Sequence, residues 1–185
     1  TFSYPLQLVN ACLYNMGCIK EDGTKIPRCE WNDNCKWEGY KREIDKVCVL
    51  FDRDFRGLET VLPNLIHTCQ EYGIEIVMSN PNFELWLLMH FPNIEKYDKE
   101  VLKRNQKNLN YQIDRKASKK KKFLEIEVGK SARGYTKGSK IKFERFIGGI
   151  DLAIEQASLF EEEIEGLVDK IGTTMGKLIK KMRTM

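Results

Sequence analysis

Two apolar stretches predict strands. Residues 47–51 (VCVLF) lead directly into Asp52 and Asp54, and residues 74–78 (IEIVM) form the second stretch. The first is a continuous apolar run, which is typical of a strand buried on both faces of a parallel sheet. Residues 57–72 between them show helical spacing, and Gly73 is placed to end that helix. The pattern predicts a β-α-β unit with a right-handed crossover.

A buried helix is expected after the second strand. Asn80 suits its N-cap and Pro81 its first position, where the missing N–H costs nothing. Residues 83–91 are apolar nearly all round, which favours burial. Glu84 lies in the first turn, where the helix dipole stabilises a carboxylate, but burial is costly unless the carboxylate has a partner.

The rest of the chain predicts helices joined by polar segments. We expect helices at 2–16, 93–110 and 143–166, and a short basic helix at 173–185. Residues 18–40 form a polar, turn-rich insertion whose Trp31 and Trp37 are expected to cover an edge of the core; stacking on a nucleic-acid base is the less favoured alternative. Residues 111–140 are expected to be loop with short elements. The fold class is α/β, a parallel sheet flanked by helices, with an α/β core at 1–95 and a mostly helical part at 96–185 of one domain.

Composition bounds the kind of protein. A hydrophobic content of 42% supports a core, and no apolar run approaches the ~18–20 residues that span a membrane, so we expect a soluble, cytoplasmic protein. The net charge of +4 proves nothing by itself. Cys48 and Cys69 fall in expected core elements. The remaining cysteines are Cys12, Cys18, Cys29 and Cys35. The spacings within the pairs are wider than is usual for a zinc site, so we expect reduced thiols; a structural zinc held by these four cysteines is the alternative.

Asp52 and Asp54 are the first candidates for chemistry. Their i, i+2 spacing would put both carboxylates on one face of a continuing strand, at the carboxyl end where α/β sheets bind ligands. Two like charges this close repel, and hard oxygen ligands without a neighbouring histidine or cysteine favour Mg²⁺ or Mn²⁺. The alternative is that the acidic residues cap the following loop or helix.

Three further features are weaker candidates. Glu84 is a candidate metal ligand or base. His90 shares the apolar face of the helix and lies about 120° around the helix from Glu84, so a core role is at least as well supported as a catalytic one. The basic block at 115–122 favours a solvated loop, with phosphate contact as the second interpretation; its lysine run is Lys119, Lys120, Lys121 and Lys122.

Two motifs carry a resemblance to a known family. Residues 51–54 (FDRD) and 79–91 (SNPNFELWLLMHF) resemble the RloB family of Toprim-like proteins, which is associated with abortive-infection and restriction loci of bacteria and archaea. The match is dense across 47–91 and looser over the C-terminal half. The resemblance implies a Toprim-like fold in which Asp52, Asp54 and a glutamate at the end of the first strand hold the metal. That strand and its glutamate are expected upstream of Thr1.

The resemblance implies a metal-dependent nuclease subunit of an anti-phage defence system. Its substrate would be nucleic acid, and an ATPase subunit would be its partner. One alternative is a non-catalytic sensor of nucleotides or nucleic acid with the same fold. A phosphatase of the haloacid-dehalogenase type also uses Asp-x-Asp, but Phe55 and Arg56 stand where those enzymes have a small residue, and the strand is not first in the chain.

Overall fold

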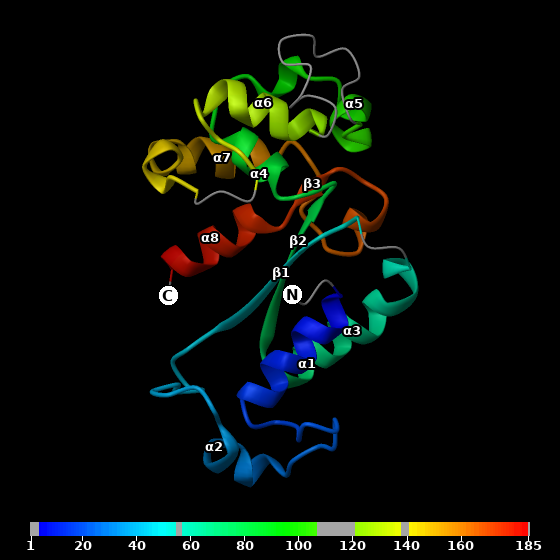
Figure 1. Ribbon diagram of the computed structural model, residues 1–185, viewed down its shortest axis with the longest axis vertical. Coiled ribbons are helices and arrows are strands. Elements are labelled where there is room, and N and C mark those ends of the chain that lie inside the picture. Colours follow the sequence, from blue (N-terminus) through cyan, green and yellow to red (C-terminus); the bar gives the residue numbers. More distant parts are fainter. Residues whose placement is uncertain (1–3, 55–56, 107–120, 138–140, 185) are drawn as a thin grey trace. The chain divides into compact units, whose positions relative to one another are not determined.

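The protein is a mixed α/β protein with a small, mostly parallel sheet. The computed structural model describes residues 4–54, 57–106, 121–137 and 141–184 (Figure 1). The strand order is β1 (Val47–Asp52), β2 (Ile74–Asn80), β3 (Gly172–Thr173). β1 and β2 run in the same direction, whereas β3 pairs antiparallel with the end of β2, Ser79 opposite Thr173. The predicted fold class is confirmed, and β3 is an addition that the sequence pattern did not indicate.

The chain divides into two compact units that share the two long strands. Unit 1 comprises Thr1–Leu50 and Phe55–Val77, and unit 2 comprises Phe51–Asp54 and Met78–Met185. The single-domain organisation expected from the sequence stays a prediction.

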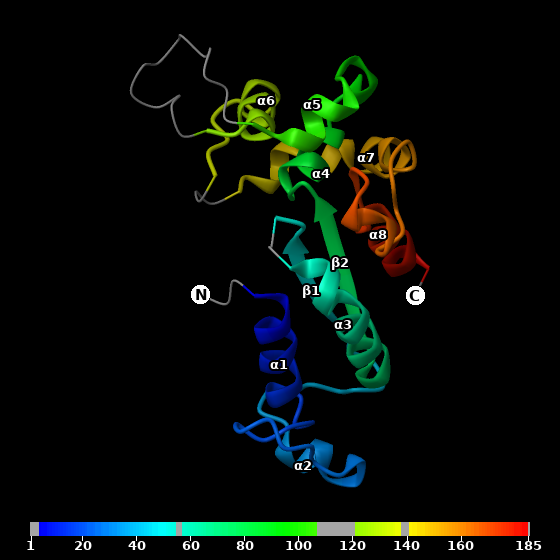
Figure 2. The same cartoon turned by 90° about the vertical axis from the view of Figure 1, so that its right-hand side faces the viewer.

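Unit 1 is built on two helices that lie side by side (Figure 2). α1 (Pro5–Asn15) buries Val9 and Leu13 against α3 (Leu58–Tyr72). A 3₁₀ turn (Arg28–Glu30) and α2 (Trp31–Asn34) lie within the turn-rich segment expected at 18–40. Trp31 is buried with its ring centroid 5.3 Å from that of Tyr72, which confirms its predicted core role. The same prediction is wrong for Trp37, because that ring is exposed beside Tyr40.

β1 is less buried than its apolar sequence predicts. Val49 is buried, but Leu50 is 47% exposed and the remaining residues are half-buried. β1 lies at the edge of the sheet among the described strands, and the face that carries Leu50 is left partly open to solvent. The expectation of a strand buried on both faces is therefore wrong for β1. It fits β2 better, where five of seven residues are buried.

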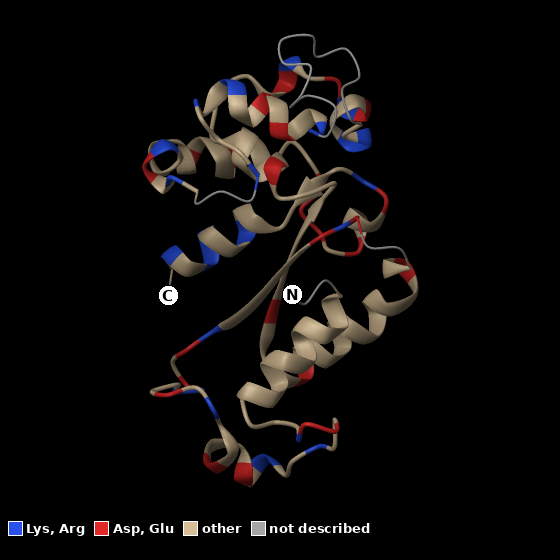
Figure 3. Ribbon diagram, viewed as in Figure 1, with Lys and Arg blue, Asp and Glu red and all other residues tan. Residues whose placement is uncertain are grey.

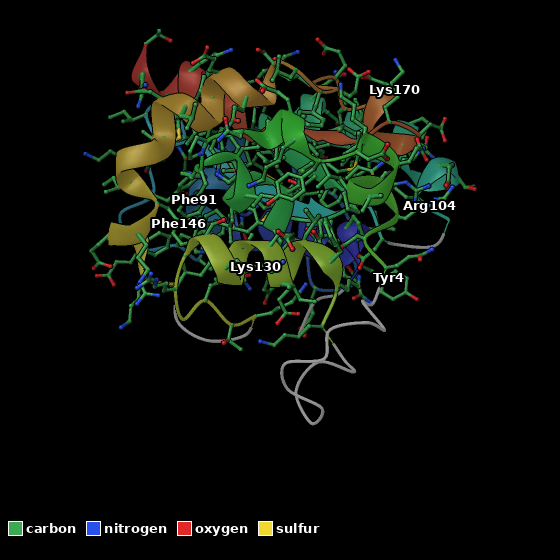
Figure 4. The ribbon with its side chains drawn as sticks, turned by 90° about the horizontal axis from the view of Figure 1, so that it is seen from above. Tyr4, Phe91, Arg104, Lys130, Phe146 and Lys170 are labelled. Carbon is green, nitrogen blue, oxygen red and sulfur yellow. The ribbon has the colours of Figure 1, made fainter. Side chains whose placement is uncertain are left out.

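Unit 2 is centred on the short helix α4 (Glu84–Met89), all of whose residues are buried. α6 (Phe123–Ser131) and α7 (Ile150–Ala157) pack against it, and α8 (Met175–Arg183) packs against α7. The rings of Phe91 and Phe146 meet beside this core with centroids 5.7 Å apart (Figure 4). The predicted burial of this helix is confirmed, and so is the basic terminal helix α8 (Figure 3).

The start of α4 differs from the prediction. Asn80 is the last residue of β2, held opposite Gly172 of β3, and its side-chain amide donates to the carbonyl oxygens of Leu167 (2.8 Å) and Lys170 (2.9 Å). It therefore does not act as the N-cap. The Asn80–Pro81 peptide bond is cis, and α4 begins only at Glu84.

The C-terminal half contains more and shorter helices than expected. The helix predicted at 143–166 is wrong: two 3₁₀ turns, Phe143–Arg145 and Ile147–Gly149, precede α7, which ends at Ala157. The chain passes so close to His90 that a Cβ at Gly149 would overlap the His90 carbonyl oxygen, and this close approach accompanies the interruption. α6 is a nine-residue helix inside the segment 111–140, which is expected from the sequence to be loop with short elements. The helix expected at 93–110 is shorter, with a 3₁₀ turn at Ile94–Lys96 and α5 at Lys99–Arg104; residues 107–110 lie outside the described part.

The cysteines are free thiols, as expected. Cys69 is buried in α3, whereas Cys48 is half-buried. Among the described residues, no group of three or more His, Cys, Asp and Glu side chains is placed to hold a metal ion, and this includes the four cysteines of the zinc alternative. No described helix is long and apolar enough to cross a membrane.

Candidate acidic site at the end of β1

Asp52 is the last residue of β1, and it contacts the start of α4. Its Oδ1 accepts a hydrogen bond from the backbone N–H of Phe83 at 2.8 Å. The next residue is anchored as well, because Arg53 donates its backbone N–H to Ser79 O and its Nε to Val168 O. Asp52 thus makes the kind of helix-start contact that the capping alternative predicts, although to a helix 31 residues away in sequence.

The surroundings of Asp52 disfavour its charge. Burial, followed by the negative charges of Asp54 and Glu84, raises the pKa of Asp52 to about 6. The hydrogen bond from Phe83 and the positive charge of Lys137 act in the opposite direction but do not compensate. At neutral pH, Asp52 is therefore an ionised carboxylate in a place that lacks sufficient positive charge.

Glu84 is the first residue of α4 and is 3% exposed. Its Oε1 accepts a hydrogen bond from the Tyr135 hydroxyl at 3.2 Å and forms an ion pair with Lys137 Nζ, also at 3.2 Å. Both partners lie in the segment that follows α6. The partner that a buried carboxylate requires is therefore present. Burial and the charge of Glu84 both raise the pKa of Tyr135. Burial alone would lower the pKa of Lys137, but the negative charge of Glu84 and its neighbours outweighs that effect, so the pKa of Lys137 is raised.

Asp54 lies in the turn after β1 rather than in a continuing strand. The prediction that both aspartates share one strand face is wrong, because β1 ends at Asp52. The side chain of Asp54 is 60% exposed, and its Oδ2 lies 3.4 Å from Lys122 Nζ. Its charge still acts on Asp52. We call Asp52, Asp54 and Glu84 the acidic site.

The predicted lysine run is described only in part. Lys122 contacts Asp54, and Lys121 is half-buried. Lys119 and Lys120 lie outside the described residues. A contact with nucleic-acid phosphate stays a prediction.

His90 lies apart from these interactions, on the core side of unit 2. Its Nδ1 is 2.9 Å from the carbonyl oxygen of Trp86, and its ring meets the rings of Trp86 (4.9 Å) and Phe146 (5.6 Å) edge-on. Burial lowers the pKa of His90, which favours the neutral ring. These contacts support the core interpretation, and a catalytic role for His90 stays a prediction.

The donor set of the acidic site suits a hard divalent cation. Carboxylate oxygens are the side-chain ligands that Mg²⁺ and Mn²⁺ prefer, and Mg²⁺ keeps several waters, so one or two carboxylates can hold it. The excess negative charge around Asp52 also favours binding of a divalent cation. The three carboxylates do not meet as a ready three-ligand group in the described part of the chain.

Sequence reasoning did not identify Tyr135 and Lys137. They are 51 and 53 positions from Glu84, in a segment without clear periodicity. Only the expectation that a buried Glu84 needs a partner pointed to such residues, and it did not say which ones.

The fold and the acidic site together define a mixed α/β protein with carboxylates gathered where a parallel strand ends. The family described as RloB-like protein has a model that matches residues 3–182, nearly the whole chain, so the chain belongs to the RloB-like family. No curated protein and no solved structure matches the chain.

Proposed function

We propose that the protein is a metal-dependent nuclease that hydrolyses phosphodiester bonds of nucleic acid within a prokaryotic anti-phage defence system. The observation that carries the proposal is the acidic site: Glu84 is buried and Asp52 half-buried, and burial together with like charges raises the pKa of Asp52 to about 6. A divalent cation is the partner that relieves this repulsion. The defence context rests on the family.

Each residue of the acidic site would have its own role. Asp52 and Asp54 would hold Mg²⁺ or Mn²⁺, and Glu84 would be a further ligand or a base. The bound cation would polarise the scissile phosphate and activate water. Lys122 and its neighbours in the lysine run would neutralise backbone phosphates, independently of base sequence.

A second candidate is a non-catalytic sensor of nucleotides or nucleic acid. The observation that favours it is that the described residues hold no group of three metal-ligating side chains, and that Glu84 already has Lys137 as its counter-ion. The nuclease proposal needs an additional ligand, the glutamate that the family resemblance implies. An ATPase subunit as partner is proposed on the same resemblance.

The experiment is a calorimetric Mn²⁺ titration of the full-length gene product. Wild type should bind Mn²⁺, and Asp52→Asn and Asp54→Asn should bind it at least tenfold more weakly, because each removes a charged ligand. Asp33→Asn, an exposed aspartate of α2 in unit 1, is the control and should bind like wild type.

A cleavage assay on DNA and RNA, with Mn²⁺ or with a chelator, completes the test. Cleavage that requires Mn²⁺ and is lost in Asp52→Asn supports the nuclease. Nucleic-acid binding without cleavage would favour the sensor. Equal Mn²⁺ affinity in all four proteins would refute the metal site and the enzyme with it.

A further inference from the structure

Two side chains from one short segment converge on a single oxygen of Glu84. Tyr135 Oη and Lys137 Nζ each lie 3.2 Å from Oε1. The side chain of Glu84 is 4% exposed, whereas that of Lys137 is 52% exposed. The ammonium group therefore reaches the buried carboxylate from the solvent side.

The charge of Lys137 serves the whole acidic site. It acts on Asp52 and Asp54 in addition to Glu84. The charge of Lys137 interacts with all three carboxylates, and Lys122 pairs with Asp54 at 3.4 Å. In the absence of a metal ion, Lys137 thus supplies much of the positive charge that the carboxylates require.

The same position makes Lys137 a competitor of a metal ion. A divalent cation and an ammonium group that use the same carboxylates repel each other. The Lys137 side chain is flexible and half exposed, so its ammonium group can move away from Glu84 and be hydrated. A buried arginine with two hydrogen bonds to the carboxylate could not do so easily. Tyr135 is uncharged and does not compete in this way.

We propose that Lys137 is the built-in counter-ion of the acidic site, and that a divalent cation must displace its ammonium group in order to bind. This inference rests on the proposed metal site. Lys137 keeps Glu84 paired while the site is empty of metal, and it raises the cation concentration at which the site fills. A monovalent cation brings no more charge than the ammonium group that it would replace, so the arrangement favours divalent ions.

The test compares Lys137→Met with wild type by Mn²⁺ calorimetry on the full-length protein. Methionine keeps an unbranched side chain and removes the charge. We expect Lys137→Met to bind Mn²⁺ about two- to fivefold more tightly, the range that loss of a partly exposed ion pair implies. If Lys137 instead helped to orient Glu84 as a ligand, the same substitution would weaken binding.

Lys130→Met is the matched control. Lys130 lies on α6 (Figure 4), its side chain is 50% exposed, and it pairs with Glu127, whose side chain is 11% exposed. Lys130 thus matches Lys137 in exposure and also pairs with a carboxylate of unit 2, but it lies outside the acidic site. Its Mn²⁺ affinity should equal that of wild type.

Thermal unfolding gives a second measurement. Without metal, Lys137→Met should unfold at a lower temperature than wild type, because Glu84 loses its cation. Saturating Mn²⁺ should raise its unfolding temperature by more than it raises that of wild type. Unchanged or weaker Mn²⁺ affinity in Lys137→Met, with wild type binding normally, would overturn this inference alone. Absence of Mn²⁺ binding in both proteins would overturn the proposed metal site as well.

Discussion

Replacing Asp52 by asparagine should stabilise the metal-free protein at neutral pH and leave its stability unchanged in acid. The pKa of Asp52 is raised from 3.8 to about 6 by burial and by its acidic neighbours. Well below pH 3.8 the carboxyl is protonated in both the folded and the unfolded chain. Between about pH 4 and 6 the unfolded chain has released its proton while the folded chain keeps it, so wild type loses stability across this window, and the loss is complete above about pH 6.

The structure sets the size of the effect. A pKa difference from 3.8 to about 6 corresponds to about 3 kcal/mol. This is an upper bound, because Asp52 is only half-buried and solvent screens part of the repulsion. Asparagine keeps a side-chain oxygen that can accept the hydrogen bond from Phe83 N–H, although more weakly than a carboxylate does. We expect a net stabilisation of about 1–2 kcal/mol at pH 8.

Urea unfolding in the presence of a chelator measures this stabilisation. The free energy of unfolding of wild type and Asp52→Asn is compared at pH 4, 6 and 8, and the difference should grow from pH 4 to 6 and then level off. Asp33→Asn is the control, because Asp33 is an exposed residue of α2 and such substitutions change stability by about 0.5 kcal/mol or less. A difference that is the same at all three pH values would refute the argument that ionisation of Asp52 opposes folding.

Two further predictions concern the remaining candidate residues. Replacing Lys119–Lys122 by glutamine should weaken nucleic-acid binding and flatten its dependence on salt concentration, because fewer counterions are released; an unchanged salt slope in a binding titration would place the run away from phosphate. His90→Asn should lower the free energy of unfolding by about 2 kcal/mol, because the ring packs between Trp86 and Phe146, and should leave Mn²⁺ affinity unchanged. Loss of Mn²⁺ binding in a folded His90→Asn protein would contradict this prediction and would support a role for His90 in metal binding.

The sequence predicted the parts of the site that depend on local pattern. Asp52 follows an apolar run, so its place at the end of β1 could be inferred, and the apolar surroundings of Glu84 predicted its burial. The exposure of Leu50 could not be inferred, because a run of apolar residues does not tell whether other elements cover both faces of the strand. Asn80 was misplaced for a related reason: a side chain suited to a helix cap instead binds two carbonyl oxygens some 90 residues away.

The missed features arise from tertiary contacts. The amphipathic spacing at 143–166 continues through Gly148 and Gly149, but the chain passes too close to His90 at Gly149 for a side chain, and the α-helix begins only afterwards. Lys137 reaches Glu84 across 53 positions, a separation at which no local spacing carries information. These contacts exist only once α4 and α6 have packed together.

The division of the chain into two interleaved units has a consequence for how the protein can be cut or recombined. Phe51–Asp54 belongs to unit 2, although the residues on both sides belong to unit 1. A gene fragment that encodes 78–185 would therefore retain Glu84, Tyr135 and Lys137 but neither aspartate. Exchange of unit 2 between related genes would need three crossover points within these residues, at 50/51, 54/55 and 77/78, instead of one. The aspartates are inherited together with Glu84 only when residues 51–54 are exchanged along with 78–185.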